Sequence, residues 1–262
     1  MTAAARAPIS AGRQSRAGGA MDLSLSQKQA LVPTGCLRAA LNHGNFVLVS
    51  RDEEHQPKGI SVDLARAFAK AAGLDLDFVE YDRAADVSAS ADRGAWDICF
   101  LAVDPKRAET LDFTQPYIRI DGRYLAGPHC DLADAGALVV AGGKVGSVEG
   151  SAYTLTLARQ EGAEHLVLFP TLAESLAALD AGEVAAIAGI GEAMAHEAAK
   201  RPGSRVLSPP FMEIRQAMAM PQGRPEAARI LKDWLAGAAR SGLTGDILER
   251  HGVARSCALM PD

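Results

Sequence analysis

The sequence predicts an α/β fold, in which buried strands alternate with amphipathic helices. Apolar runs bounded by turn residues, such as the run from Ala95 to Val103, have the length of buried strands. Other segments carry apolar residues at helical spacing, with capping residues at their starts. With 262 residues, the chain is long enough for one large domain or two small domains with apolar cores.

Composition argues against several classes of protein. The net charge is −5 and no basic stretch is interleaved with aromatic residues, which argues against nucleic-acid binding. No apolar run approaches the roughly 18 residues of a membrane span. The four cysteines are scattered without C-x-x-C spacing, so we expect no metal site, no redox motif and no cofactor.

Residues 1–34 are expected to form a disordered or poorly ordered N-terminal tail. Residues 1–20 are rich in alanine, glycine, serine and arginine and contain no acid. They also lack the apolar core of a secretory signal, which favours a cytoplasmic location. A true start at Met21 and a transit-type presequence stay open, and a periplasmic location is the alternative.

The folded part is expected to begin with a strand at 37–41, followed by a loop. Ligands bind beyond the carboxyl ends of strands in open α/β sheets, so Asn42 and Asn45 of this loop are ligand-binding candidates. Both could equally be turn formers and nothing more. The next helix is predicted to start with Ser61 as its N-cap and to end at Gly73.

The segment 94–117 carries the strongest functional signal. Its strand-like run ends at Asp104 and a proline, where a short helical turn can start. Arg107 lies on this turn, just beyond the carboxyl end of the strand, and a guanidinium there can hold a carboxylate through two parallel hydrogen bonds. The alternative is a solvated arginine that pairs with Glu109 or Asp112.

This segment is similar to a pattern of the family 3 solute-binding proteins, the amino-acid-binding components of ABC importers. The residues that match are Gly94, Asp97, Pro105, Arg107, Asp112, Phe113, Pro116 and Tyr117, with Thr114 in place of serine. The similarity extends over about residues 35–252. It implies a periplasmic-binding-protein-like fold of type II, with two lobes, two crossings and a ligand cleft between the lobes.

On this resemblance, lobe 1 would comprise residues 35–123 and 215–262, and lobe 2 would comprise residues 124–214. Phe100 and Ala102, on the strand before Arg107, join the ligand-binding candidates. The relatives cover the ligand with an aromatic residue of the first loop, and Phe46 is the candidate for that position here.

In lobe 2, a strand that ends at Val148 is followed by a glycine turn and a helix that starts at Ser151. A helix start after a glycine can bind anions through its free N–H groups. Gly150 and Ser151 match the carboxylate clamp of the relatives, whereas Ala152 replaces a residue with a hydroxyl group. Ser151 could also be a plain N-cap, because capping and anion binding use the same atoms.

Ile190 is the most consequential departure from the family pattern. The relatives carry an aspartate there, which typically binds the α-ammonium group of the ligand. Without that carboxylate, a buried ammonium group would carry a large desolvation cost. We therefore expect a small carboxylate ligand that is not an ordinary α-amino acid. Glu192 could compensate from the next turn, or could be only a first-turn helix acid.

The chain is expected to return to lobe 1 through 211–220, with Gln216 or Glu213 facing the cleft, and to end in helices at 225–239 and 243–250. The expected function is that of a solute-binding protein, either a cytoplasmic sensor or scavenger or, if exported, the partner of an ABC permease. The alternative is an enzyme on the same fold, similar to cyclohexadienyl dehydratase, with Glu149, Glu192 or Glu213 as general acid.

Overall fold

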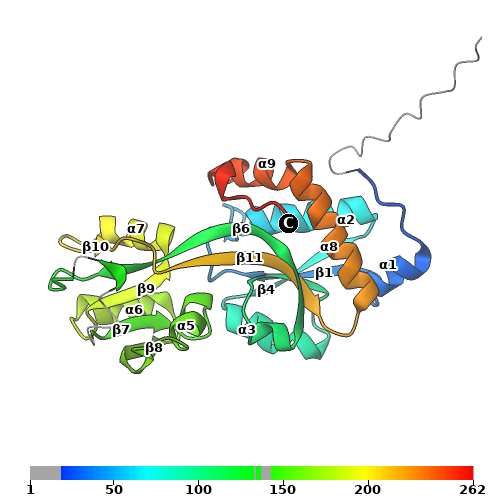
Figure 1. Cartoon of the computed structure of the whole chain (residues 1–262). Helices are drawn as coiled ribbons and strands as arrows, with labels where there is room; N and C mark the ends of the chain where they lie inside the picture. The colour runs from blue at the N-terminus through cyan, green and yellow to red at the C-terminus, as the bar shows by residue number, and fades with distance from the viewer. Residues whose placement is uncertain (1–18, 133, 137–142, 262) are drawn as a thin grey trace, which may run out of the picture.

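The computed structural model describes residues 19–132, 134–136 and 143–261. It has two α/β lobes, joined by two long strands that run from one lobe into the other, β6 (Leu111–Ala126) and β11 (Met212–Pro221) (Figure 1). The two strands pair antiparallel along most of the length of β11. The predicted two-lobed α/β fold with two crossings is therefore confirmed.

One sheet passes through both lobes, in the strand order β4-β1-β5-β11-β6-β9-β7-β8, with β10 beside β6. In lobe 1, β1 pairs in parallel with β4 and β5, and in lobe 2, β7 pairs in parallel with β8 and β9. Parallel strands expose their carboxyl ends at one edge, which is where such sheets bind ligands. The arrangement therefore brings two binding edges to the boundary between the lobes.

Lobe 1 contains three sheet strands and most of the helices. The strands are β1 (Leu37–Asn42), β4 (Leu76–Tyr81) and β5 (Ile98–Ala102), with a small hairpin of β2 (Ser50–Arg51) and β3 (Pro57–Lys58). The helices are α1 (Leu25–Leu31), α2 (Ile60–Ala72), α3 (Ala84–Ala89), α8 (Pro225–Arg240) and α9 (Leu243–Arg250). Helices α2, α8 and α9 cover one face of the sheet and α3 covers the other (Figure 1).

Helix α2 begins two residues earlier than a Ser61 cap would allow. Its N-cap is Gly59, with a φ of 130°, and Ser61 is buried in the first turn. A Cβ on Gly59 would lie 2.4 Å from the carbonyl oxygen of Leu48, so only glycine fits this approach. The cap prediction was wrong because close backbone packing, and not a side-chain hydrogen bond, sets the start of the helix.

Lobe 2 is smaller and has its own apolar core. Its strands are β7 (Val145–Val148), β8 (Leu166–Phe169), β9 (Ala186–Ile190) and β10 (Arg205–Val206), and its helices are α5 (Ala152–Leu157), α6 (Leu172–Asp180) and α7 (Gly191–Ala199). The core gathers Leu125, Leu179, Ile187 and Met194 from strands and helices of this lobe. Ser151 is the N-cap of α5 as predicted, since its Oγ accepts a hydrogen bond from the N–H of Thr154.

The described part of the N-terminal tail is ordered, in contrast to the expectation for residues 1–34. Helix α1 starts with a capping box, in which Ser24 and Gln27 each accept a hydrogen bond from the backbone of the other. Leu31 at its end is fully buried in the core of lobe 1. Residues 1–18 lie outside the described part of the chain.

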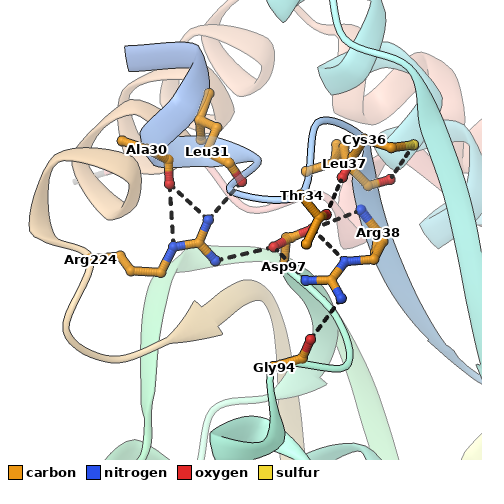
Figure 2. A network of polar contacts seen from close by, with 9 residues as sticks. All are labelled: Ala30, Leu31, Thr34, Cys36, Leu37, Arg38, Gly94, Asp97 and Arg224. Atoms are coloured by element: carbon orange, nitrogen blue, oxygen red, sulfur yellow. Dashed lines mark hydrogen bonds and ion pairs between the residues drawn. The ribbon is translucent and has the colours of Figure 1, made fainter. Parts of the chain in front are cut away.

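Charged side chains hold the end of α1 against lobe 1 (Figure 2). Arg224 donates hydrogen bonds to the carbonyl oxygens of Ala30 and Leu31, each at 2.7 Å. It also lies 3.4 Å from the carboxylate of Asp97, which is 1% exposed and receives two further hydrogen bonds from the guanidinium of Arg38. Asp97 is therefore compensated by two arginines, one of which ties down the N-terminal helix.

Within the described ranges, no helix combines the length and the apolar character that crossing a bilayer requires.

Candidate functional site

A cavity of about 520 Å³ lies between the two lobes. Lobe 1 lines it with the ends of β1 and β5 and the segments that follow, and β11 adds two side chains. Lobe 2 lines it with the ends of β7 and β9 and the starts of α5, α6 and α7. Ten of the candidate residues lie in its wall, namely Asn42, Asn45, Phe46, Ala102, Arg107, Glu149, Ser151, Ala152, Ile190 and Gln216.

The other candidates lie outside this wall. Phe100 is deeper on β5, where its ring packs edge-on against Tyr117 at 6.5 Å. Glu213 is exposed and pairs with Arg215 at 2.8 Å. Glu192 is exposed on α7, because the side of this helix that carries Ala193 and Met194 faces the cavity. Gly150 contributes its carbonyl group to the site without lining the cavity.

Arg107 is a buried cation at the cavity wall. It stands at the start of a short 3₁₀ turn beyond the end of β5 and is 4% exposed. Its Nη1 donates to the carbonyl oxygen of Ala102 at 3.1 Å and its Nη2 to that of Gly150 at 3.0 Å. Among the described residues, its Nε–H finds no hydrogen-bond partner, and no acidic side chain forms an ion pair with its guanidinium. The alternative of a solvated arginine paired with Glu109 or Asp112 does not hold here.

The charge of Arg107 is only partly compensated. Burial lowers the pKa of its guanidinium, and the nearby carboxylate of Asp104 acts in the opposite direction. That carboxylate is itself 3% exposed and is held by Arg159 of lobe 2 at 2.8 Å and by the N–H of Lys106 at 2.8 Å. Because Asp104 is already paired with Arg159, it compensates the charge of Arg107 only in part.

The turn before α5 approaches lobe 1 closely. Gly150 has a φ of +70°, and a Cβ on it would lie 2.6 Å from the Cβ of Ala85 on α3. The hydroxyl group of Ser151 accepts from the N–H of Thr154 at 3.2 Å and lies 2.8 Å from the Thr154 hydroxyl group. Ser151 therefore acts as an N-cap in this structure, and Gly150 allows the lobes to meet.

The wall of lobe 2 is mainly apolar. Ile190 ends β9 and lines the cavity at the position where the family pattern has an aspartate. Acidic residues line the cavity elsewhere, with Asp82 and Glu149 both exposed. A third acid, Asp86, is hydrogen-bonded to Arg83 at 2.8 Å, and this contact lowers the pKa of Asp86.

Asn45 is the most buried polar residue that the first loop contributes. It is 5% exposed, and its Oδ1 has no partner among the described residues. Asn42 instead uses its Oδ1 to accept from the N–H of Gly44 at 3.1 Å, as a turn former does. Phe46 lines the cavity and is 49% exposed.

Sequence reasoning missed several lining residues, including Leu172, Ala193 and Met194 of lobe 2 and Arg83 of lobe 1. All four stand one to four residues beyond the carboxyl end of a strand or at the start of a helix, which is the signal that could have identified them. In the described ranges, no group of three or more histidine, cysteine or acidic residues is placed to hold a metal ion.

Comparisons with known proteins agree on the fold. The family model "Bacterial extracellular solute-binding proteins, family 3" matches residues 37–254. No curated protein matches the chain. Among solved structures, a mutant of ArgBP from T. maritima has a TM-score of 0.72 at 18% identity, with 86% of this chain and 99% of that chain covered. A histidine kinase sensor domain with similarity to periplasmic binding proteins has a TM-score of 0.72 at 22% identity, with 86% and 98% covered.

A third similar structure is the ancestral amino acid-binding protein AncCDT-1, a precursor of cyclohexadienyl dehydratase. Its TM-score is 0.70 at 21% identity, with 86% of this chain and 98% of that chain covered. At these identities the likeness concerns the fold, and the ligand has to be argued from the cavity itself.

Proposed function

Because the chain belongs to the bacterial extracellular solute-binding proteins of family 3, we propose that it closes its two lobes around a small carboxylate that is not an ordinary α-amino acid. The observation that carries this proposal is Arg107. A buried guanidinium that lines a cavity and forms no ion pair with a described residue is costly unless an anion binds to it there. A carboxylate fits its planar array of donors.

The second argument is the absence of a counter-charge for an ammonium group at Ile190. An α-amino acid would bring its ammonium group close to the carboxylate that Arg107 holds. Ile190 offers only apolar surface there, and the acids Asp82 and Glu149 of the cavity wall are exposed. A carboxylate without a neighbouring ammonium group avoids this desolvation cost.

We propose that closure around the ligand is the signal that a partner reads. A cytoplasmic protein would act as a sensor or scavenger. An exported one would deliver its ligand to an ABC permease. Both roles use the same cleft and the same anchor, so the ligand can be identified before the partner.

A thermal-shift screen of the purified protein tests the proposal. Carboxylates should raise the melting temperature by mass action, whereas standard amino acids should not. The Arg107→Ala variant should lose this response, and Arg229→Ala, which removes an exposed arginine of α8, should keep it. Stabilisation by amino acids, or an unchanged carboxylate response in Arg107→Ala, would contradict the proposal.

An enzyme is the second candidate function, and Glu149 is the residue that supports it. Of the three acids considered as general acid, Glu149 alone lines the cavity. It is exposed, whereas a general acid at neutral pH is usually buried, and this favours binding over catalysis. If the protein turned over prephenate and the Glu149→Gln variant did not, catalysis would be favoured over binding.

A further inference from the structure

The lobe 2 side of the cavity contains an apolar pocket, which we define by Leu172, Gly189, Ile190, Ala193 and Met194. Its residues come from the end of β9, the first turn of α7 and the start of α6. Ala193 and Met194 follow Ile190 by three and four residues. On the first turn of a helix, this spacing places them on the same side.

This apolar pocket offers a ligand no charge and no free hydrogen-bonding side chain. Two polar side chains adjoin the pocket in sequence. Thr171 uses its hydroxyl group to cap α6, where it accepts from the N–H of Glu174, and Glu192 is exposed on the other side of α7. Ala193 and Met194 are 5% and 0% exposed and belong to the apolar core of the lobe, so the floor of the pocket is part of a packed layer. A polar group placed here would lose its water without gaining a partner.

Met194 and Gly189 shape this pocket together. A Cβ on Gly189 would lie 2.5 Å from the Cε of Met194, so the absence of a side chain at Gly189 lets the methionine lie across the end of β9. The unbranched thioether of methionine adapts to apolar groups of different shape. This combination suits a bulky apolar group better than a short polar one.

From this arrangement we propose that the ligand is a monocarboxylate with a bulky apolar group, of branched-aliphatic or phenyl size, which occupies the apolar pocket. The inference rests on the proposed function, because it takes Arg107 as the anchor for the carboxylate. The cavity of about 520 Å³ has room for both ends of such a molecule. Each methylene group that enters the pocket is expected to tighten binding about fourfold, the equivalent of about 0.8 kcal/mol.

Calorimetric titration with five probes tests the inference. Acetate carries only the anchor group, 3-methylbutanoate and 3-phenylpropanoate add an apolar group, and glutarate adds a second carboxylate. The neutral 3-phenylpropanamide keeps the apolar group and removes the charge. We expect 3-phenylpropanoate to bind at least tenfold more tightly than acetate or glutarate, with 3-methylbutanoate in between.

The Leu172→Gln variant tests the pocket itself. Leu172 is only partly buried at the first position of α6, so the variant should fold. It should weaken 3-phenylpropanoate binding about tenfold and leave acetate unchanged. Leu168→Gln is the matched control, since Leu168 is 52% exposed and lies outside the cavity wall.

Each outcome separates the apolar pocket from the carboxylate anchor. If glutarate or acetate binds as tightly as 3-phenylpropanoate, the role of Arg107 as the carboxylate anchor is supported and the role of the apolar pocket is contradicted. If the amide binds as tightly as the acid, the pocket stands and the role of Arg107 is wrong. If neither binds, both the inference and the proposed function fall.

Discussion

Ile190 decides, through one side chain, whether the cleft can neutralise an ammonium group. We predict that Ile190→Asp creates an amino-acid binder, because the new carboxylate would stand where the family pattern has one. The affinity for an amino acid such as glutamine should rise at least tenfold, which corresponds to about 1.4 kcal/mol. Calorimetric titration with the amino acid and with its deaminated analogue measures the affinity of the variant for a ligand with the ammonium group and for one without it.

The control for this variant is Leu168→Asp, which adds an acid at an exposed position outside the cavity. It should leave both affinities unchanged. The result that would count against the argument is an Ile190→Asp protein that folds, keeps its carboxylate affinity and still ignores amino acids.

Gly150 is the residue on which closure depends sterically. We predict that Gly150→Ala impairs closure, because its Cβ would overlap with Ala85 across the lobe boundary and its φ of +70° disfavours a side chain. A positive φ at an alanine costs about 1–2 kcal/mol of folding free energy, and the steric overlap with Ala85 adds to this cost. The backbone strain should lower the melting temperature, whereas the overlap, which depends on how closely the lobes approach, should in addition lower ligand affinity more than tenfold.

Gly162→Ala is the matched control for Gly150→Ala. Gly162 also has a positive φ, of +86°, but it stands in the segment before β8, outside the cavity wall. It should cost a similar amount of folding free energy and leave affinity unchanged. Equal loss of affinity in both variants would show that strain, and not closure, is responsible.

At this scale, residues that stand directly at a strand end could be placed from the sequence, and others could not. Arg107 follows a strand with a clear apolar run, Ile190 ends one and was also marked by the family pattern, and both line the cavity. Phe100 could not be assigned correctly because the sequence does not say how far along a strand the cavity reaches. Met194 was missed although it stands four residues beyond the end of β9, and its packing against Gly189 is a contact that the sequence pattern does not show.

Among the elements, α1 is tied to lobe 1 by an arginine of a distant segment as well as by the burial of Leu31. We predict that Arg224→Ala releases α1 from lobe 1, because Arg224 supplies the hydrogen bonds to Ala30 and Leu31 (Figure 2). Loss of these charged hydrogen bonds should cost about 1.5–3 kcal/mol of folding free energy. Hydrogen exchange of residues 25–31 should become much faster, while β1 stays protected.

Arg229→Ala serves as the control on the same helix, where it removes a surface pair with Asp233. Such a pair contributes about 0–1 kcal/mol, so exchange in α1 should not change. Fast exchange in α1 of the unsubstituted protein would contradict the anchoring role of Arg224.

Helix α1 was not predicted, because the composition of the N-terminal stretch favoured disorder. The N-terminal stretch is poor in acids and rich in small residues, which favours disorder for its first part. The pair Ser24 and Gln27, however, has the spacing of a capping box, and this signal was readable in the sequence. The contact between α1 and Arg224 could not be read from the sequence, since Arg224 and Ala30 are 194 residues apart in the chain. Long-range contacts of this kind decide whether a marginal seven-residue helix is stable.

For the whole molecule, the lobes touch through polar contacts that need no ligand. Arg159 of lobe 2 binds Asp104 of lobe 1, and Arg107 donates to the carbonyl oxygen of Gly150. The sequence indicated two lobes and two crossings, but it could not pair Asp104 with Arg159. They are 55 residues apart in the chain and belong to different lobes.

We predict that Arg159→Gln shifts the ligand-free protein towards an open state. The variant removes the cation that holds the buried carboxylate of Asp104 and leaves a side chain that can still be hydrated on the surface. Because Arg159 is half-exposed, we expect a shift of about 1 kcal/mol, about fivefold in the equilibrium between closed and open forms. Small-angle X-ray scattering without ligand should then report a larger radius of gyration than for the unsubstituted protein.

Salt separates this electrostatic contact from a merely packed interface. Screening is stronger at 1 M salt, where the Debye length is about 3 Å, than at 0.15 M, where it is about 8 Å. The open fraction of the unsubstituted protein should therefore increase as salt is added, whereas Arg159→Gln, which lacks this ion pair, should respond little. Arg229→Gln, which removes an exposed arginine far from the cleft, should behave like the unsubstituted protein. If all three proteins share one radius of gyration at both salt concentrations, the contact between Asp104 and Arg159 does not set the closure equilibrium, and the bound ligand must supply the whole driving force.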